Sequence, residues 1–190
     1  AAGGNLNTGR GEMGGCGIQT AGLAYGGNSS TAASNATEEY NGTSWSEQNN
    51  LALARSFMGS TGTQTAGLAI GGMIGAPTYA SQTAVELYNG TSWTGITALS
   101  SAKANSTAFG TSTAAVAAGG ITFPGTVGNQ AEEYNGTAWT TGNALGTSRA
   151  YGTGSGILTA GLFFGGSTDG GDTNTVGNTE EYDGTSWSEQ

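Results

Sequence analysis

The stretch TAGLAIGG, residues 65–72, decides the fold because closely similar words occur three more times along the chain. The copies read TAGLAYGG at 20–27, TAAVAAGG at 113–120 and TAGLFFGG at 159–166. Each word is a short apolar run that ends in two glycines, as expected for a strand that is buried on both faces and followed by a tight turn. Self-similarity at a nearly fixed period is typical of repeat proteins, so the whole sequence is aligned on this word.

A second word follows each copy of the first. It reads EEYNGTSW at 38–45, ELYNGTSW at 86–93, EEYNGTAW at 132–139 and EEYDGTSW at 180–187. The Glu-to-Tyr segment predicts a third strand, and the tryptophan belongs to a fourth strand. The tryptophans are Trp45, Trp93, Trp139 and Trp187. Asn-Gly between Tyr and Trp predicts a two-residue type I′ turn in which both central residues have positive φ, and Asp183 followed by Gly favours the same turn.

One basic residue completes each repeat, and a small-residue stretch after it, such as 56–64, predicts the first strand. The chain has only four basic residues: Arg10, Arg55, Lys103 and Arg149. From each of them to the second glycine of the following word is 17 residues in all four copies, whereas the step from that glycine to the next glutamate varies from 11 to 14. The segment between the second and third strands is therefore the one that is free to change in length.

Four-stranded units with these markers resemble the kelch-repeat family of β-propellers, in particular secreted microbial or phage-type kelch-like repeats. The resemblance rests on the double glycine, the Glu two residues before Tyr, the Trp five residues after Tyr and the basic residue ten residues after Trp. It covers essentially the whole chain and implies an all-β single domain of four antiparallel blades, with repeats at approximately 1–48, 49–96, 97–142 and 143–190. Two departures are the short Tyr-to-Trp spacing and the count of four, since kelch propellers commonly have about six blades.

Three arrangements of the blades stay open. They are a four-bladed ring, a half-ring whose copies associate, and part of a longer propeller. The last two are favoured because the repeats begin and end at blade boundaries, so no strand is shared between the first and last blades. Self-association or further blades in a longer chain are expected accordingly, because repeat units contact only their neighbours.

The recurring charged and aromatic residues have a structural and a functional interpretation. We expect each basic residue to pair with a repeat glutamate and the aromatic residues to pack within or between blades. The glutamates are Glu38, Glu86, Glu132 and Glu180. The alternatives are an anion site made by four cations around a central channel and a sugar-stacking platform made by the aromatic rings.

Composition excludes several classes of function. A net charge of −9 and a pI near 4.1 argue against a nucleic-acid partner and against docking on an anionic membrane. The longest apolar stretch, 156–164, is too short to cross a bilayer, so no membrane insertion is expected. The chain has no histidine, which removes histidine-based catalysis and imidazole metal sites. We therefore expect a noncatalytic protein without a cofactor or a metal ion.

The length-variable segments are the expected place of recognition, because loops on a rigid scaffold commonly carry binding residues. The candidates are Met73, Ile74, Tyr79 and Phe123 as apolar contacts and Asp169 and Asp172 as polar ones. A calcium site at the two aspartates is less favoured than a polar turn, because their spacing matches no known calcium loop. The expected function is a structural or protein-interaction and adhesion module, and the alternative is a lectin-like glycan binder. The partner would be a protein or glycan surface, and the place extracellular or on a virion or cell surface.

Overall fold

The computed structural model describes residues 3–29, 32–171 and 173–190, and these residues form twenty β-strands and no helix. The strands build four four-stranded antiparallel sheets and two two-stranded sheets. The predicted all-β class and the predicted four-stranded antiparallel units are therefore present. Each large sheet falls within one of the four repeats, and these are called repeats 1 to 4 below.

The strands of the large sheets pair with one another within their own repeat. Repeat 1 contains β1 (Gly14–Ile18), β2 (Ala21–Tyr25), β3 (Thr37–Tyr40) and β4 (Trp45–Gln48). Repeat 2 contains β5 (Gly59–Thr63), β6 (Ala66–Ile70), β9 (Val85–Tyr88) and β10 (Trp93–Ile96). Repeat 3 contains β11 (Thr107–Thr111), β12 (Ala114–Ala118), β15 (Ala131–Tyr134) and β16 (Trp139–Thr141). Repeat 4 contains β17 (Thr153–Ile157), β18 (Ala160–Phe164), β19 (Thr179–Tyr182) and β20 (Trp187–Glu189).

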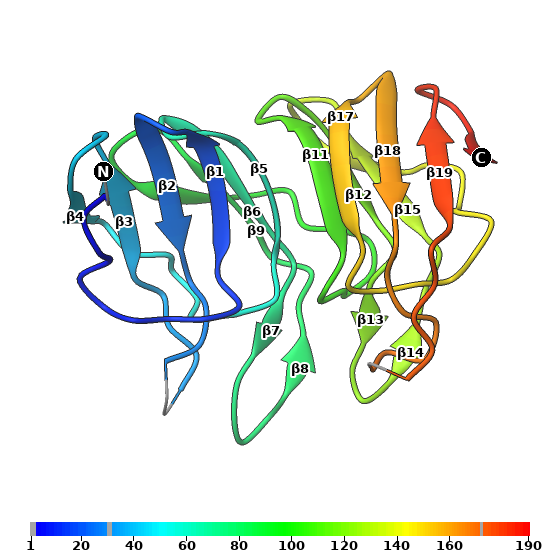
Figure 1. The fold of residues 1–190 in the computed structure, drawn as a ribbon, viewed down its shortest axis with the longest axis horizontal. Coiled ribbons are helices and arrows are strands. Elements are labelled where there is room, and N and C mark those ends of the chain that lie inside the picture. The colour runs from blue at the N-terminus through cyan, green and yellow to red at the C-terminus, as the bar shows by residue number, and fades with distance from the viewer. Residues whose placement is uncertain (1–2, 30–31, 172) are drawn as a thin grey trace.

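The sheets stand side by side in chain order, and the first strand of each lies innermost. β5 contacts both β1 and β11, and β11 contacts β17. In Figure 1 the outer sheets, with β1–β2 on the left and β17–β19 on the right, lie towards the viewer, whereas β6 and β12 lie behind them. The four innermost strands line a shared hollow of about 250 Å³. Its lining residues are 15–17, 60–62, 108–110 and 154–156.

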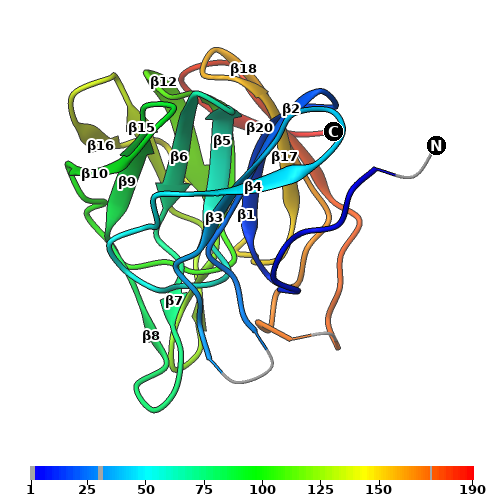
Figure 2. The same ribbon diagram turned by 90° about the vertical axis from the view of Figure 1, so that its left-hand side faces the viewer.

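The short turns, between the first and second strands and between the third and fourth strands, lie at one end of the sheets, and the length-variable segments lie at the other. Gly42, between β3 and β4, lies beside Thr20, between β1 and β2, since a Cβ added at Gly42 would lie 3.5 Å from the Thr20 Cα. Gly90 and Thr65 show the same neighbourhood in repeat 2. Figure 2 shows the length-variable connections gathered at the other end, where a hairpin of β7 (Met73–Ile74) and β8 (Ala80–Ser81) projects from the sheets. All the variable segments therefore share one end of the molecule.

The predicted type I′ turn between the third and fourth strands is wrong. Tyr40 pairs directly with Trp45, which leaves a four-residue loop, and within this loop only Gly42 has a positive φ, of 90°. The Asn41 Oδ1 atom accepts hydrogen bonds from the amides of Thr43 at 2.9 Å and Ser44 at 3.0 Å. The asparagine thus acts through its side chain as an Asx turn instead of through its backbone. Asp183 accepts the corresponding two bonds in repeat 4.

The hydrophobic core lies between neighbouring sheets. At the boundary of repeats 1 and 2, the Tyr25 ring lies 4.7 Å from the Trp93 ring, and the Tyr25 hydroxyl donates to the Leu68 carbonyl at 2.8 Å. Leu23 and Tyr25 are both almost fully buried there. Cys16 packs against the same cluster, and burial raises the pKa of its thiol to about 12. Burial of these apolar side chains between neighbouring sheets therefore stabilises the packing of one sheet on the next.

The length-variable segments of repeats 2 and 3 form hairpins that the sequence did not predict. β7 (Met73–Ile74) pairs with β8 (Ala80–Ser81), and β13 (Ile121–Thr122) pairs with β14 (Thr126–Val127). The strands are only two residues long, which is too short for an alternation of apolar and polar residues to be recognised. Both hairpins project from the end of the molecule opposite to the β3–β4 type of turn (Figure 1).

Candidate functional site

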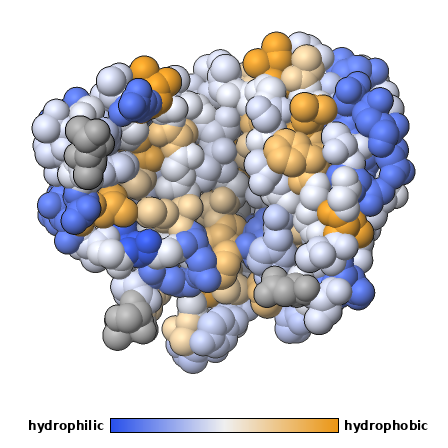
Figure 3. All heavy atoms as spheres, viewed as in Figure 1, coloured by the Kyte–Doolittle hydropathy of each residue, from blue (hydrophilic) through white to orange (hydrophobic). Residues whose placement is uncertain are grey.

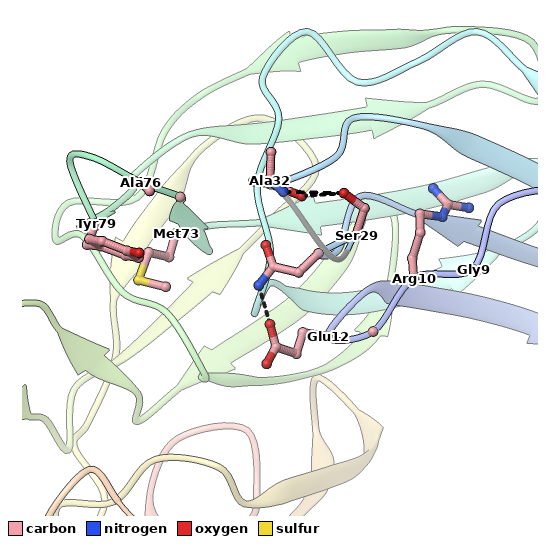
Figure 4. A pocket seen from close by; sticks show the side chains of 12 residues that line it. Gly9, Arg10, Glu12, Ser29, Ala32, Met73, Ala76 and Tyr79 are labelled. Atoms are coloured by element: carbon pink, nitrogen blue, oxygen red, sulfur yellow. Dashed lines mark hydrogen bonds between the residues drawn. The ribbon is translucent and has the colours of Figure 1, made fainter.

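The candidate site is a hollow of about 540 Å³ at the end of the molecule that carries the variable segments. One wall is the β7–β8 hairpin of repeat 2, which contributes Met73, Ala76 and Tyr79. The other wall comes from repeat 1, with Glu12 and its neighbours 9–11 before β1, and with Asn28 and Ser29 after β2. Figure 4 shows Tyr79 and Met73 on one side of the hollow, across from Glu12, Ser29 and Arg10. The site is therefore made by segments of two adjacent repeats.

The repeat 1 wall is held by a short ladder of hydrogen bonds. The amide of Gly11 donates to the carbonyl of Asn28 at 2.9 Å, and the amide of Asn28 donates back to Gly11 at 2.8 Å. The Asn28 side-chain amide donates to the Glu12 carboxylate. Glu12 itself has a φ of 56°, a left-handed conformation that non-glycine residues rarely adopt. This geometry places an acidic and an amide side chain next to each other on the wall.

The repeat 2 wall carries an aromatic residue at its rim. Tyr79 is 57 % exposed although it is a large aromatic side chain, and its φ of 43° is also left-handed. Its amide donates to the Gly75 carbonyl at 3.2 Å, which closes the tip of the hairpin. An added Cβ at Gly75 would lie 3.3 Å from the Cβ of Ala33, so the loop of the hairpin touches the variable segment of repeat 1. The Tyr79 ring is thus presented to solvent on a braced hairpin.

The structure divides the predicted binding residues among different places. Tyr79 and Met73 line the hollow, and Ile74 lies on the same hairpin. Phe123 lies in the hairpin of repeat 3, where it packs against a cluster that contains Ile121. Asp169 lies in repeat 4, and Asp172 lies outside the described residues.

Two of these residues have roles other than the expected ones. Met73 is only 6 % exposed and belongs to the cluster of Ala104, Ile121 and Ala150, so its side chain packs mainly against the next repeat. Asp169 accepts hydrogen bonds from Ser167, Thr173 and the amide of Gly171, and the first of these is the largest cause that lowers its pKa to about 2. This carboxylate folds its own loop, as the polar-turn interpretation expects.

Glu12 and Asn28 are site residues that the sequence did not single out. The sequence offered one signal for this pair: the first two strands of a repeat are antiparallel, so the residues just before the first strand and those just after the second lie at the same end of the sheet. Their partnership with a hairpin of the next repeat depends on how neighbouring sheets pack. That packing is not encoded in any single motif.

The four basic residues lie inside the repeats. Each pairs with the glutamate of its own repeat at 2.7–3.1 Å, and in every pair both side chains are at most 5 % exposed. The pairs are Arg10–Glu38, Arg55–Glu86, Lys103–Glu132 and Arg149–Glu180. The inner hollow is lined mostly by glycine, serine, alanine and threonine, and no basic residue lines it. The expected ion pairs are present, and the cations do not converge on a channel.

Each arginine also closes the start of the variable segment. The Arg55 Nη1 atom donates to the carbonyls of Gly71 at 2.6 Å and Ala84 at 2.7 Å, which lie on either side of the β7–β8 hairpin. Arg10 makes the equivalent bonds to Gly26 and Ala36 in repeat 1. In Figure 4 the Arg10 guanidinium is turned away from Tyr79, in agreement with its pairing to Glu38. Arg10 thus supports the wall of the candidate site instead of offering its charge to a ligand.

Comparisons with known proteins give no family assignment, since no protein-family model matches the chain and no curated protein is detectably similar to it. Within the described residues, no three acidic or cysteine side chains gather as a group that could hold a metal ion. Over the same part of the chain there is no helix that could span a membrane.

Proposed function

We propose that this chain is a noncatalytic binding module whose four sheets are blades of a kelch-like β-propeller. Three observations support the propeller arrangement: one antiparallel sheet per repeat, the first strand of each sheet innermost, and the core between neighbouring sheets. Radial repetition of four-stranded sheets has these features. The single domain would then extend over the whole printed sequence.

The binding function rests on one observation, the braced tyrosine at the rim of the hollow between repeats 1 and 2. An aromatic ring that is 57 % exposed on a hairpin tied to its neighbours is held ready to contact a partner. Aromatic residues supply much of the contact energy at binding surfaces at a low cost in conformational entropy. The variable segments around it form the recognition surface for a protein or a glycan.

A lectin-like function is the second candidate, and the composition of the hollow favours it. Glu12 and Asn28 offer a carboxylate and an amide opposite Tyr79, which is the combination of hydrogen-bonding groups and an aromatic face that a sugar ring needs. The repeats also resemble secreted microbial and phage-type repeats in their low content of charged residues. A location outside the cell or on a virion or cell surface agrees with this function.

Binding of the fluorescently labelled chain to a glycan array and to intact cells tests the proposal. The matched pair of variants is Tyr79→Ala and Tyr151→Ala, since both tyrosines are exposed and both have positive φ, but only Tyr79 lines the hollow. We expect Tyr79→Ala to lose at least tenfold in affinity and Tyr151→Ala to bind as the parent chain does. Equal binding by both variants would remove the hollow as the site. Glycan-array binding that depends on Tyr79 would select the lectin-like function over protein recognition.

A further inference from the structure

The last sheet exposes a face that is buried in every other sheet. Leu162 and Phe164 on β18 are 37 % and 40 % exposed. Their counterparts in repeats 1 to 3 are at most 2 % exposed: Leu23, Leu68 and Val116 for the first, and Tyr25, Ile70 and Ala118 for the second. The counterparts are buried because the following sheet covers them, as Trp93 and Leu68 of repeat 2 cover Tyr25. Repeat 4 therefore has the face that in other repeats receives a next sheet.

The first sheet exposes the opposite face. Tyr40 is half-buried, whereas its counterparts Tyr88, Tyr134 and Tyr182 are at most 3 % exposed. Leu6 is likewise half-buried, although the corresponding leucines Leu51, Leu99 and Leu145 are at most 4 % exposed. These positions become buried where a preceding sheet packs on them. Figure 3 shows the side on which both outer sheets lie, with a hollow between two lobes and apolar side chains at the surface of the right-hand lobe.

We propose that the exposed face of repeat 4 binds the exposed face of repeat 1 in a second copy of this chain, so that two copies joined head to tail close one ring. The repeat 4 face is defined by Leu162, Phe164, Thr179 and Glu181, and the repeat 1 face by Leu6, Gln19, Tyr40 and Trp45. The two outer sheets that carry these faces, with β1–β2 in one and β17–β19 in the other, lie on the same side of the molecule (Figure 1), as a two-fold closed pair requires. This proposal goes beyond the loop hollow, because neither face contains Tyr79.

The boundary between repeats 1 and 2 supplies the template for this contact. There the Trp93 Nε1 donates to the Thr37 hydroxyl at 2.9 Å, and the Tyr88 hydroxyl donates to the Glu39 carboxylate at 3.0 Å. The donors stand on the later repeat and the acceptors on the earlier one. At the two ends of the chain, the donor positions are Trp45 and Tyr40, and the acceptor positions are Thr179 and Glu181. Each donor of the repeat 1 face thus has its acceptor on the repeat 4 face.

Gln19 provides a third matched contact. Its counterpart Gln64 donates from Nε2 to the carbonyls of Gly22 at 3.1 Å and Tyr40 at 2.8 Å, which belong to the preceding sheet. Repeats 3 and 4 have Ser112 and Leu158 at this position, so the glutamine is not a constant of the repeat. Gln19 is exposed, and it is the same type of residue that repeat 2 uses at this position to bind the preceding sheet.

The two end faces have the hydrogen-bonding residues that occur at the boundary of repeats 1 and 2, and not the residues that occur at the boundary of repeats 2 and 3. Between repeats 2 and 3, Val85 and Leu87 replace the threonine and the glutamate, and Tyr134 packs near Leu87 instead of bonding a carboxylate. Thr179 and Glu181 restore both acceptors in repeat 4. The repeat 4 face is exposed although it has the threonine and the glutamate that accept hydrogen bonds at the buried boundary of repeats 1 and 2, and the repeat 1 face has the matching donors. These two faces therefore fit a contact with a second copy of this chain better than a contact with solvent.

Disulfide crosslinking tests the register of the contact. At the internal boundary, an added Cβ at Gly67 would lie 3.2 Å from the Cys16 sulfur, close to the Cβ–S separation across a disulfide. The corresponding positions at the ends are Ser155 and Gly22. In a Cys16→Ser background, the double variant Ser155→Cys/Gly22→Cys is oxidised with copper phenanthroline and separated on a non-reducing gel. We expect a covalent dimer, and no crosslink from either single variant under the same conditions.

Light scattering behind size exclusion tests the stoichiometry of the uncrosslinked chain. We expect the parent chain to have twice its 18.7 kDa mass and Leu162→Asp to have the mass of one chain. Ile18→Asp is the matched control, because Ile18 is 70 % exposed and its counterparts Thr63 and Thr111 stay exposed inside the row of sheets. This control is expected to remain a dimer. Circular dichroism of both variants establishes that their strands are formed.

Three results would overturn the proposal. A crosslink within one chain would mean that the four sheets close on themselves, and a parent chain of 18.7 kDa without any crosslink would mean that the faces do not bind a second copy. A species that grows beyond two copies would mean that the contact propagates as an open filament. Ligand binding at Tyr79 is measured separately, so a failure here leaves the proposed function to its own test.

Discussion

The indole nitrogen of Trp93 donates a 2.9 Å hydrogen bond to the hydroxyl of Thr37 in the preceding sheet. The corresponding nitrogens of Trp139 and Trp187 are buried without a hydrogen-bond partner among the described residues. The reason is that Val85 and Ala131 occupy the position of Thr37 in the sheets that precede them. A buried N–H group without a partner costs stability, so this chain contains the same contact in a satisfied and an unsatisfied form.

We expect Val85→Thr to stabilise the protein by about 1 kcal/mol, because the new hydroxyl would accept a hydrogen bond from Trp139. The free energy of urea unfolding measures the change. In a Trp139→Phe background the same substitution should instead cost about 1–3 kcal/mol, since the buried hydroxyl would have no indole to bind. A loss of the same size in both backgrounds would contradict the proposed geometry.

Arg55→Met should destabilise the protein by about 3–5 kcal/mol, because it leaves the buried Glu86 carboxylate without its counter-charge. It also removes the hydrogen bonds to Gly71 and Ala84 that close the variable segment of repeat 2. Chemical denaturation monitored by tryptophan fluorescence gives the difference. Glu47→Gln is the control, since Glu47 is exposed and its substitution should change stability by less than about 0.5 kcal/mol. Equal stabilities of the two variants would exclude a structural role for the ion pair.

Lys103→Arg should stabilise repeat 3 by about 1 kcal/mol. The Lys103 Nζ atom lies 3.1 Å from the Glu132 carboxylate, but the angle between the two groups is not that of a hydrogen bond. Nζ also bonds neither of the two carbonyls that correspond to those bound by arginine in the other repeats. The carbonyls in question here belong to Gly119 and Gln130, which line a hollow of about 300 Å³ beside Lys103. The melting temperature is the measurement. A decrease on substitution would mean that this hollow cannot admit the guanidinium.

Stability should fall in acid as Glu132 becomes protonated. Burial opposes ionisation of this carboxyl, but the amide of Ser100 and the ammonium of Lys103 together lower its pKa below the ordinary value of 4.5. A carboxyl whose pKa is lower in the folded state contributes stability that is complete above pH 4.5 and is lost as the pH falls through the folded-state pKa. Protonation also leaves Lys103 buried without a counter-charge.

The urea midpoint measured between pH 7 and pH 3 checks this expectation. The Glu132→Gln variant should begin less stable at pH 7 and lose less stability over the same range. Parallel curves for the parent chain and the variant would assign the acid sensitivity to other carboxylates.

Local patterns in the sequence predicted the parts of this fold that depend on a short stretch of chain. TAGLAIGG gave the second strand and its double-glycine end, and the fixed spacing from Arg55 to Gly72 anticipated a constant framework. The pairing of Arg55 with Glu86 was predictable because only one basic residue and one constant glutamate occur in each repeat. These features need no knowledge of how the sheets are arranged.

Features that depend on a neighbouring sheet, or on a side chain that competes with the local backbone geometry, were missed. The Asn41 turn was mispredicted because its side chain can bind the amides of Thr43 and Ser44, which competes with the backbone geometry that Asn-Gly favours. Met73 appeared to be a loop residue, yet it is buried against Ala104 and Ile121 of the next repeat. Glu12 and Asn28 became site residues only because a hairpin of repeat 2 lies opposite them. The structure of the Asn41 turn is decided by a competing local hydrogen bond, and the other features are decided by residues that are far away in the sequence.

The completeness of each sheet within its own repeat also governs how the chain can acquire its structure. Among the described residues, β1 to β4 pair with one another and with no strand of another repeat, so a sheet can form as soon as its own residues are available, and the next sheet can then add to it. Each step would cover one apolar face and create another, as Tyr25 is covered by repeat 2 while Phe164 remains open after repeat 4. A chain in the course of folding would thus expose an apolar face of its latest sheet at each step, and such a face can bind other incompletely folded copies.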